Sequence, residues 1–586
     1  MSFEQSSVSD APLVSIIILN YNKAQLTIEC LESIWEHTAH VPFEVIVIDN
    51  GSTPEEFQKL KNYSGRHHLV GLQVNRFFGE GNNIGAEMAR GKFLVFMNND
   101  VTVTSHWLEP LLHAFQKYPD CGAAGPKFVY PNGMLQEAGA LLRNDGANVQ
   151  IGKFQDPSLP RFNQERVADY CSAATLMIKK NLFERVLGFD RNFEPAYYED
   201  VDLCLKIGQL GLKVYYIPDS SVVHHENATT SDPRLGVRLT HLVGENREKF
   251  VHRWKPFLET GEHLPAPLEE RTPNDRPVSL DSVHSARRMA IATERVLTLD
   301  DSSTYLLHVA DALIAHGYET WLLTPERYSH LRVRQLALEL QLDLHRLKLA
   351  RLDDPLNPKD LHLILRISEN SKIPEITADL PLPLLPVEMP TTLPPKKVGS
   401  IVSIGEFFRD PALEWEKSLL QTFRALQAIH PSLELHLIGV GLSNASHREN
   451  FVRCRELASG LPVMCYSNPS LSQINELLGS ATLYWQAPLS SEADTYLLRA
   501  MSAEAIPLRF RPSQTPESGE ETLELSETSW NTPQQLEGST LKLLSLSASS
   551  RSHLGGLARK SLEHRTRETF RRNWGDVLNR IGLGAS

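Results

Sequence analysis

The strongest constraint on the fold of this chain is a series of short, continuously apolar runs that each end in polar residues. Three of them, VSIIILNYN (14–22), FEVIVIDNGS (43–52) and KFLVFMNNDV (92–101), lie near the start of the chain. Such runs, separated by amphipathic stretches such as KAQLTIECLESIWEHT, are typical of parallel strands covered on both faces. Because the carboxyl ends of these strands meet at one edge of an open α/β sheet, where ligands bind, the polar ends predict a single site.

The alternation of strands and helices continues along the 586 residues, a length that predicts several folding units. Regions rich in Pro and polar residues separate them. The predicted organisation is a disordered leader (1–12), an α/β domain (13–260), a linker (261–286), a first α/β lobe (287–395) and a second α/β lobe with a C-terminal helix (396–586). Within the lobes we expect strands at 294–301, 361–368, 399–407 and 433–441, and a loop at 511–540.

The composition limits the class of protein. Hydrophobic residues make up 41% and charged residues 22% of the chain, as in globular proteins, and the net charge of −12 argues against a nucleic-acid binder. The six cysteines lack metal-binding spacing, the chain starts without a signal peptide, and no apolar run reaches the roughly 18–20 residues that span a bilayer. We therefore expect a cytoplasmic protein, for which peripheral contact with the inner face of the membrane stays open.

Two signals near the first strands each allow two interpretations. Asp49 follows the second apolar run, where a carboxylate can accept hydrogen bonds from a nucleobase or from ribose hydroxyls, or can cap the next helix. The stretch NRFFGEGNNIGAEMARG (75–91) has the pattern of a Gly-rich loop before a helix, which can approach a phosphate or be an ordinary loop.

The third run ends in NND (98–100), so Asp100 can hold a hard divalent cation with a neutral oxygen from Asn98, or the segment can be a polar turn. Later in the chain, His224 in VVHH follows a strand. It is a candidate metal ligand or a satisfied polar residue.

The segment YYEDVDL (197–203) clusters three acids behind two aromatic residues. On a helix, Glu199 and Asp202 share a face, whereas Asp200 points elsewhere. The cluster can supply a general base, or it can only complement the helix dipole.

The ordered set of motifs resembles the family 2 glycosyltransferases of GT-A fold, most closely their bacterial rhamnosyltransferase-like branch. The set comprises VSIIILNYN, VIDNGS, the Gly- and Asn-containing stretch, FMNND, LGFD, YYEDVDLCLK and IPDSSVVHH, and it covers residues 13–255. The resemblance implies a GT-A domain with a Rossmann-like, mainly parallel sheet. It also implies a UDP- or dTDP-sugar donor, a glycan or glycoconjugate acceptor, and Mg²⁺ or Mn²⁺.

The same resemblance implies roles for individual residues. Asp100 and His224 would hold the metal, and Asp200, beside Glu199, would be the catalytic base of an inverting displacement. Asp49 would contact the nucleobase, and the whole set around the nucleotide-sugar would be Tyr21, Asn22, Asp49, Asn83 and Asn98. Asn98 stands where the family's Asp-x-Asp metal motif has its first Asp, which leaves one charge fewer for the metal.

The second region resembles, more weakly, the family 4 glycosyltransferases of GT-B type. The motifs are SIGEFF, LELHLIGVG and SSEADTYLLRAMSAEAIPL. The position where that family has its second donor-binding glutamate holds Arg499, and Glu492 is one residue out of register. We therefore expect a GT-B-like pair of lobes that is altered or inactive in transfer and that scaffolds or binds an acceptor.

Three functions compete at this stage. The first is a sugar transferase of bacterial surface polysaccharide or glycoconjugate biosynthesis, which the intact set of Asp49, Asp100 and Asp200 favours. The second is a bifunctional transferase with two active domains, against which Arg499 argues. The third is a non-catalytic glycan-binding scaffold. A fragment ending near Gly261 is expected to fold and to keep donor hydrolysis, because all candidate residues precede it.

Overall fold

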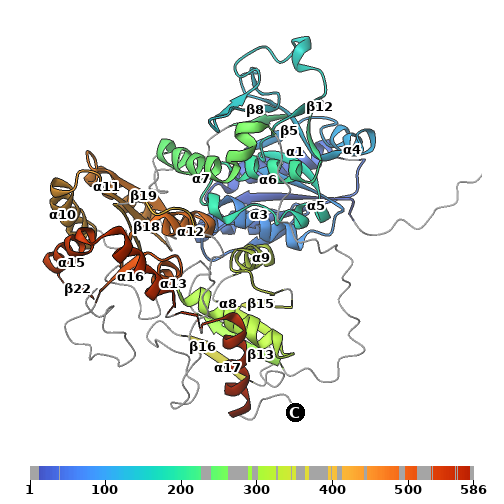
Figure 1. The fold of residues 1–586 in the computed structure, drawn as a ribbon. Coiled ribbons are helices and arrows are strands. Elements are labelled where there is room, and N and C mark those ends of the chain that lie inside the picture. The colour runs from blue at the N-terminus through green and yellow to red at the C-terminus, as the bar shows by residue number, and fades with distance from the viewer. Residues whose placement is uncertain are drawn as a thin grey trace, which may run out of the picture. The chain divides into compact units, whose positions relative to one another are not determined.

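The structure, a computed structural model, contains two compact units (Figure 1). The first comprises residues 1–283 and 326–335, and the second comprises residues 284–325 and 336–586. The residues that the structure describes are 12–38, 40–225, 239–261, 288–293, 301–324, 327–344, 346–351, 363–367, 393–397, 399–405, 412–440, 445–486, 495–510, 529–530, 532–560, 562–563 and 565–580. Residues 1–11 of the predicted leader, most of the 261–286 linker and residues 511–528 lie outside this set.

The first unit is built on one ten-stranded sheet with the order β10-β12-β6-β11-β4-β1-β2-β3, to which β5 and β7 add at β12 and β6. Strands β1 to β4 pair in parallel, β11 runs antiparallel to β4 and β6, and β12 is parallel to β6. The strands are β1 (Val14–Asn20), β2 (Phe43–Asp49), β3 (His68–Gly71), β4 (Phe93–Asn98), β5 (Val101–Val103), β6 (Cys121–Val129), β7 (Leu135–Glu137), β10 (Arg166–Ala168), β11 (Thr175–Lys179) and β12 (Lys213–His224). A separate hairpin pairs β8 (Ala140–Leu142) with β9 (Asn148–Gln150).

Helices cover both faces of this sheet, which explains why the strands are apolar without alternation. On one face Ile17 packs with α3 (Phe77–Met88), α5 (Lys180–Arg185), α6 (Glu199–Gln209) and α7 (Leu239–Thr260). On the other face Ile16 and Ile18 pack with α1 (Ala24–His37), α2 (Pro54–Asn62) and α4 (Leu108–Lys117). The predicted fold class of this domain, α/β with a mainly parallel sheet, is confirmed.

The Gly-rich stretch 75–91 is not the predicted loop, because most of it forms helix α3. The glycines let this helix lie close to the sheet. A Cβ atom on Gly81 would come 2.5 Å from the Leu19 side chain, and one on Gly85 would come 2.5 Å from Ile17. The glycines therefore serve helix–sheet packing in this unit.

The second unit contains two parallel sheets, so the predicted pair of α/β lobes is confirmed. The first sheet has the order β15-β14-β13-β16, and the second has the order β19-β18-β17-β20-β21-β22. Their strands are β13 (Arg288–Thr293), β14 (Glu319–Thr324), β15 (Lys348–Arg351), β16 (Leu363–Ile367), β17 (Ser400–Gly405), β18 (Glu434–Gly439), β19 (Val463–Ser467), β20 (Leu483–Trp485), β21 (Ile506–Phe510) and β22 (Ser529–Trp530). The strand expected at 294–301 lies almost entirely outside the described residues, and β13 directly precedes it.

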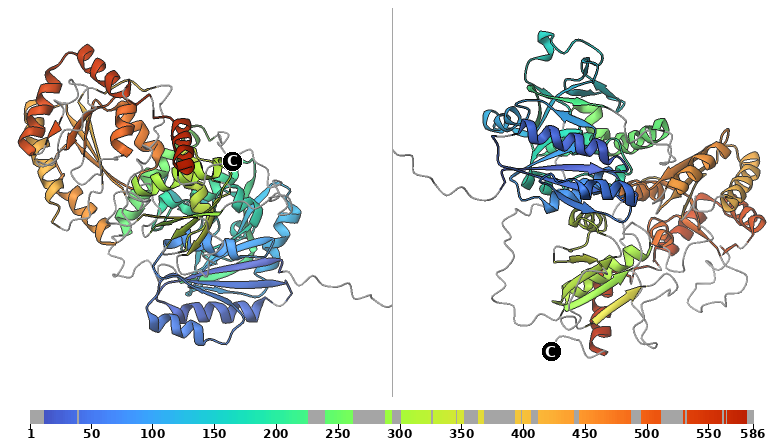
Figure 2. Two further views of the ribbon diagram at one scale, coloured as in Figure 1. Left: turned by 90° about the horizontal axis from the view of Figure 1, so that it is seen from below. Right: turned by 180° about the vertical axis from the view of Figure 1, so that it is seen from behind.

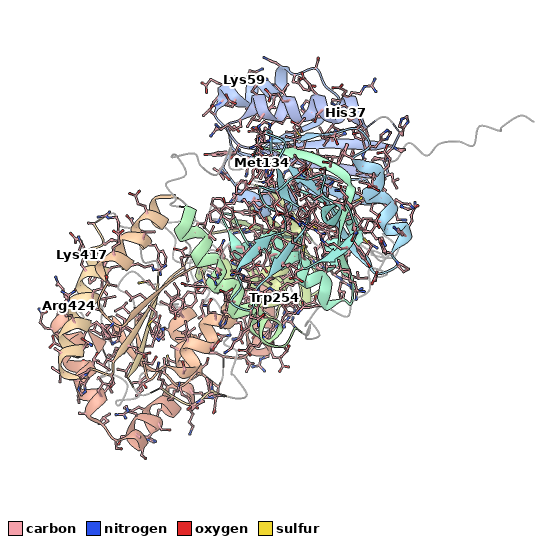
Figure 3. All side chains as sticks on the ribbon, turned by 90° about the horizontal axis from the view of Figure 1, so that it is seen from above. His37, Lys59, Met134, Trp254, Lys417 and Arg424 are labelled. Atoms are coloured by element: carbon pink, nitrogen blue, oxygen red, sulfur yellow. The ribbon has the colours of Figure 1, made fainter. Side chains whose placement is uncertain are left out.

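Helices lie on both sides of the larger sheet of this unit (Figure 2). Leu419 and Phe423 on α10 (Glu414–Ile429) are buried, whereas Lys417 and Arg424 on the same helix are exposed (Figure 3). The other helices of the unit are α8 (Asp301–Ala315), α11 (Ala445–Leu457), α12 (Leu471–Ser480), α13 (Thr495–Ser502), α15 (Pro533–Ser545), α16 (Ala548–Lys560) and α17 (Arg567–Arg580). Helix α15 begins inside the predicted loop 511–540. Among the helices of the described residues, none is both long and apolar enough to cross a bilayer.

The boundaries of the first unit differ from the prediction in one respect. Residues 326–335, which were expected in the first lobe, belong to this unit. Leu331, at the start of α9 (His330–Glu339), is 3% exposed and joins the hydrophobic core of the first unit. A fragment that ends near Gly261 therefore lacks part of this core.

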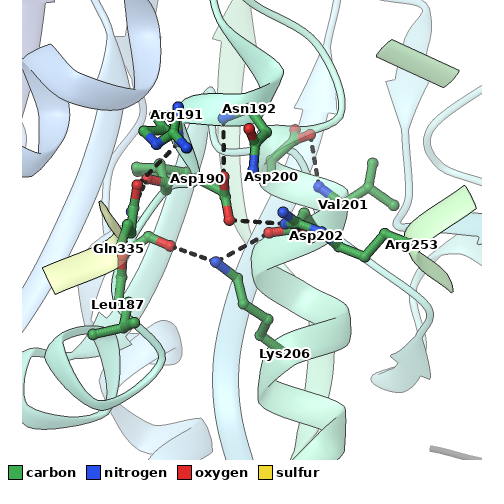
Figure 4. A network of polar contacts seen from close by, with 12 residues as sticks. Leu187, Asp190, Arg191, Asn192, Asp200, Val201, Asp202, Lys206, Arg253 and Gln335 are labelled. Atoms are coloured by element: carbon green, nitrogen blue, oxygen red, sulfur yellow. Dashed lines mark hydrogen bonds and ion pairs between the residues drawn. The ribbon is translucent and has the colours of Figure 1, made fainter. Parts of the chain in front are cut away.

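A buried ionic network ties α7 to α6 (Figure 4). The Arg253 guanidinium lies 2.8 Å from a carboxylate oxygen of Asp190 and 3.0 Å from one of Asp202. Asp202 also accepts a hydrogen bond from the Trp254 indole at 2.9 Å and lies 3.0 Å from the Lys206 ammonium. Helix α7 is therefore an integral part of the first unit.

Replacing Arg253 with Met should lower the free energy of unfolding of the first unit by about 3–5 kcal/mol, because the fully buried Asp202 and the largely buried Asp190 lose their shared cation. Urea titration read by hydrogen exchange in peptides from α6 and α7 would measure the change. The matched control is the exposed Lys255 on the same helix, whose replacement with Met should cost no more than about 0.5 kcal/mol. Equal effects of the two substitutions would contradict the role of the network.

The same network predicts a loss of stability in acid. Burial alone would raise the pKa of Asp190, but the charges of Arg253 and Lys206 outweigh it and hold this pKa well below its usual range. A carboxylate with a depressed pKa contributes its stability above the unfolded-state pKa, about 3.9, and loses it as the pH falls through the folded-state pKa. The stability gap between the wild type and Arg253→Met should therefore shrink as the pH is lowered below about 4.

Candidate active site

Asp49 ends β2 and is held in place by neighbouring loops. Its side chain is 2% exposed, its Oδ1 accepts a hydrogen bond from the Asn20 amide at 2.7 Å, and its Oδ2 accepts one from the Ser52 N–H at 3.2 Å. The next helix, α2, is capped by the hydroxyl of Thr53 instead. The alternative interpretation of Asp49 as the cap of that helix is therefore wrong.

The residues after β1 are tied to the same loop. The Asn22 N–H donates to the Ser52 hydroxyl at 2.9 Å, and the Asn22 side chain accepts from the Thr53 N–H at 2.8 Å. Asn22 has a φ of 54°, which Asn tolerates better than most residues. Tyr21, beside it, is half-buried. The two strand ends that were predicted to flank a nucleotide, those of β1 and β2, thus meet.

Asn83 has a different environment from the predicted nucleotide contact. It is 1% exposed on α3, and its amide makes two hydrogen bonds to the backbone of Phe189, one to the carbonyl at 2.9 Å and one from the N–H at 3.0 Å. These bonds join α3 to the loop that precedes α6. The nucleotide contact of Asn83 stays a prediction, and the bonds in the structure support a positioning role.

Asp100 and His224 come together because of strand pairing. The short β5 follows Asp100 directly and pairs with β12, in a register that sets His224 opposite Val101. The Asp100 Oδ1 and the His224 Nε2 lie 3.2 Å apart, and both side chains are buried. Asn98, at the end of β4, is half-buried, and its backbone N–H donates to the Ala174 carbonyl at 2.9 Å.

The second ring nitrogen of His224 is held by a residue that the sequence did not single out. Its Nδ1 lies 3.1 Å from the amide nitrogen of Gln136, on β7. If the amide is turned so that its oxygen accepts from Nδ1–H, the Nε2 lone pair faces Asp100. The Asp100 Oδ1 and the His224 Nε2 are then two electron-pair donors that can bind the same cation. The hydrogen bond from the other ring nitrogen to Gln136 orients the imidazole.

The residues therefore fit a divalent metal ion with few protein ligands. Within the described ranges, no cluster of three or more His, Cys, Asp and Glu side chains could hold a metal. Asp100 and His224 would form a two-residue set. Magnesium and similar ions are often held by one or two protein ligands and take the others from water and substrate phosphates.

Three acids at the start of α6 have separate environments. Asp202 is fully buried in the ionic network described above, so it is structural. Asp200 accepts hydrogen bonds from the N–H groups of Ala173 at 3.3 Å and Val201 at 2.8 Å, and burial raises its pKa. Burial and the neighbouring Asp200 raise the pKa of Glu199 well above its usual value. The prediction that Asp200 points away from Asp202 is confirmed (Figure 4).

The turn that presents these acids is strained and clamped. Tyr197 and Tyr198, the two residues before α6, have φ values of 76° and 73°, which side-chain-bearing residues rarely adopt. The Asn246 amide on α7 donates to the carbonyls of Phe193, Ala196 and Tyr197 at 2.7, 2.8 and 3.1 Å. Strain of this kind persists only where surrounding contacts over-determine it, and it is often found at functional sites.

A further buried carboxylate, Glu137 on β7, was missed from the sequence. Its side chain is 2% exposed and accepts from the Ser172 N–H at 3.3 Å, next to the Ala173 N–H that binds Asp200. Burial raises the pKa of Glu137 to about 7, and the charge of Asp200 adds to the effect. The one available signal was the polar pair Gln136–Glu137 before the apolar stretch AGALL.

These contacts form a closed chain. Asp100 faces His224, His224 contacts Gln136, and the adjacent Glu137 binds the Ser172 N–H. Next to Ser172, the Ala173 N–H donates to the Asp200 carboxylate. The Ala174 carbonyl accepts from the N–H of Asn98, which lies two residues before Asp100 and so completes the series of contacts. The candidate metal ligands and the candidate base therefore lie in one buried, acidic region at the carboxyl end of β4.

The first part of this chain is similar to known glycosyltransferases. Residues 15–186 match the model of the family described as Glycosyl transferase family 2. The O-antigen biosynthesis protein RfbC of Myxococcus xanthus is 31% identical over 38% of this chain and 18% of its own length. The N-acetylglucosaminyl-diphospho-decaprenol L-rhamnosyltransferase of Mycobacterium tuberculosis is 26% identical over 36% of this chain and 74% of its own, and the rhamnosyltransferase WbbL of Escherichia coli is 23% identical over 36% and 83%.

These similarities concern part of the chain. The chain spans only 18% and 28% of the length of two of the curated relatives it matches, RfbC and the uncharacterized protein y4gI of Sinorhizobium fredii. A solved structure of GalNAc-T7 with UDP, GalNAc and Mn²⁺ is similar over 42% of this chain and 50% of its own, at 15% identity and a TM-score of 0.35, which supports no conclusion about this chain. The resemblance of the second unit to family 4 glycosyltransferases stays a prediction. The match of residues 15–186 to the Glycosyl transferase family 2 model confirms the predicted enzyme class, glycosyltransferase, for this part of the chain.

Proposed function

We propose that this protein is an inverting, metal-dependent glycosyltransferase that moves a sugar from a UDP- or dTDP-sugar to a glycan, lipid-linked or protein acceptor. The observation that carries the proposal is the closed chain of contacts from Asp100 through His224 to Asp200. It brings the two candidate metal ligands and the half-buried carboxylate of Asp200 to the same strand end. The names of the relatives support a role in bacterial surface polysaccharide or glycoconjugate biosynthesis.

The chemistry assigned to this chain is a single displacement. Asp200 accepts the proton of an acceptor hydroxyl while the hydroxyl oxygen attacks the anomeric carbon of the donor, and the bond from that carbon to the nucleoside diphosphate breaks. Attack from the face opposite the leaving group inverts the anomeric configuration. Burial raises the pKa of Asp200, which makes it a stronger base than an exposed carboxylate.

The other residues hold the donor. Asp49, fixed by Asn20 and Ser52, presents a carboxylate for the base or ribose of the nucleotide. Asp100 and His224 would hold a divalent ion, which when bound offsets the negative charge of the leaving diphosphate. The scarcity of protein ligands means that ion and diphosphate would bind together.

We also propose that the second unit does not transfer sugar and serves as an acceptor or assembly surface. Arg499, which stands where the resembled family has a glutamate, is buried on α13 at 9% exposure. A buried arginine there would not replace a carboxylate that accepts hydrogen bonds from a sugar. Transfer of sugar from a nucleotide donor by residues 280–586 alone would favour the bifunctional alternative instead.

Replacing Asp200 with Asn should lower turnover by about 10²–10⁴-fold and leave donor affinity within about twofold, because the amide keeps the shape but cannot accept the proton. Release of nucleoside diphosphate from a panel of UDP- and dTDP-sugars, together with calorimetric donor binding, would separate the two effects. Asp219, an exposed carboxylate on β12, is the control, and its change to Asn should leave both quantities unaltered. Turnover above a tenth of the wild-type value would exclude Asp200 as the base.

Replacing His224 with Ala should raise the Mn²⁺ concentration needed for half-maximal turnover by about tenfold, within the 10–100-fold range typical of altered metal sites. Asp100→Ala should have a larger effect in the same direction, because it removes the charged ligand. The adjacent His225 is exposed and offers a matched control. An unchanged metal requirement in both Asp100→Ala and His224→Ala, or full wild-type activity in excess chelator, would show that the metal assignment is wrong.

A further inference from the structure

Residues 326–335 belong to the first unit although residues 284–325, which belong to the second unit, separate them from it along the chain. Most of their polar side chains are buried: Ser329 is 0%, Arg332 5% and Gln335 5% exposed. Burying polar groups costs free energy unless they are hydrogen-bonded, so their partners show what the segment does.

The first partner is the turn that leads to the candidate base. The Arg332 guanidinium donates to the Glu194 carboxylate at 2.6 Å, and both side chains are largely buried. Glu194 begins the strained turn whose last residue, Tyr198, directly precedes Glu199. Arg332 therefore binds the first residue of this turn, and the Asn246 amide on α7 binds the carbonyls of Ala196 and Tyr197 within it.

The second partner is the loop before that turn (Figure 4). The Gln335 amide donates to the carbonyls of Leu187 and Phe189 at 2.8 and 2.9 Å and accepts from the Arg191 N–H at 3.2 Å. The Phe189 carbonyl also accepts from Asn83. Gln335 thus fixes three backbone groups of the loop.

The third partner is the nucleotide side of the site. Ser329 donates to the Glu80 carboxylate on α3 through its N–H at 2.7 Å and its hydroxyl at 2.9 Å. The Tyr328 ring lies under the Arg76 guanidinium, 4.3 Å from its central carbon. The Arg76 N–H in turn donates to the side chain of Asn50, the neighbour of Asp49, at 2.7 Å.

We propose that residues 328–335 are an intrinsic positioning segment for the active site, and that Arg332 and Gln335 act on catalysis by ordering the turn that presents Asp200. The proposal rests on the proposed function. Tyr328, Ser329, Arg332 and Gln335 contact Arg76, Glu80, Glu194 and backbone groups of the loop 187–191. They contact the loops on both flanks of the site, so the catalytic domain is incomplete without a segment that lies beyond its predicted C-terminal boundary.

The test uses the full chain with Arg332→Gln, Arg332→Lys and Gln335→Ala. The control is Arg334→Gln, since Arg334 lies on the same helix, is half-exposed and donates to the carbonyl of Glu184 on α5. Hydrogen exchange of peptides covering residues 187–201 is read by mass spectrometry. Release of dTDP from dTDP-rhamnose with Mn²⁺ gives kcat and KM.

We expect Arg332→Gln and Gln335→Ala to speed hydrogen exchange in residues 187–201. Both should lower kcat by about tenfold, because a small misplacement of a catalytic group can cost up to roughly 10²-fold in rate. KM should stay within about threefold of the wild-type value. Arg332→Lys should recover most of kcat because it keeps the charge opposite Glu194. Unaltered exchange in both variants, or a loss of kcat that the Lys variant does not recover, would overturn the proposal.

If Arg332→Gln does not fold, Ser329→Ala, which removes one hydrogen bond to Glu80, gives the same readouts. No turnover in the wild type would count against the transferase proposal, whereas the exchange measurement tests the positioning role by itself.

Discussion

The candidate site depends most on the pairing of β12 with β5 and β6. The register of β5 and β12 sets His224 beside Asp100, and backbone hydrogen bonds of a sheet maintain that register. Since β7 pairs with β6, the same sheet brings Gln136 to the far side of the imidazole. The distance between the two candidate metal ligands is thus set by the fold and not by flexible loops. Burial of both groups strengthens any interaction with a cation, because the local dielectric is low.

The base side of the site is organised differently. Asp200 lies at the start of α6, directly after a turn with two residues in left-handed conformation, so contacts from outside the turn must enforce its position. Helix α7 supplies one set through Asn246 and through Arg253, which reaches the neighbouring Asp202. The segment 328–335 supplies the other set through Arg332. In the candidate site, strand pairing fixes the two candidate metal ligands, and contacts from outside the turn fix the candidate base. These contacts come from α7 and the segment 328–335, the last parts of the first unit along the chain.

Much of this could be predicted from the sequence, for physical reasons. Strands β1, β2 and β4 are buried on both faces, so their apolar runs stand out, and their polar ends mark the site. The sequence identified the acids of α6 as a group, but only the structure shows that they have different partners. Asp202 pairs with Arg253, whereas Asp200 accepts from the Ala173 N–H. The Gly-rich stretch was expected to be a loop that can approach a phosphate, whereas in the structure its glycines let α3 pack closely on Ile17 and Leu19.

Other features could not be predicted from local pattern. The antiparallel β11 is a short apolar strand, and nothing in five residues encodes its direction. Gln136, Glu137 and Asn246 act through partners far away in sequence. Residues 326–335 resemble any polar connection in a lobe, and only the folded contacts of Ser329 and Arg332 assign them to the first unit. Tertiary contacts of this kind leave no periodic signal.

The most direct test of the central claim is a crystal structure of the protein with dTDP and Mn²⁺, with the ion located by its anomalous scattering. The account predicts one Mn²⁺ bound by the Asp100 carboxylate and the His224 Nε2, with further ligands from the diphosphate and the nucleotide close to Asp49. Nucleotide bound without this ion, or Mn²⁺ that contacts neither Asp100 nor His224, would contradict it.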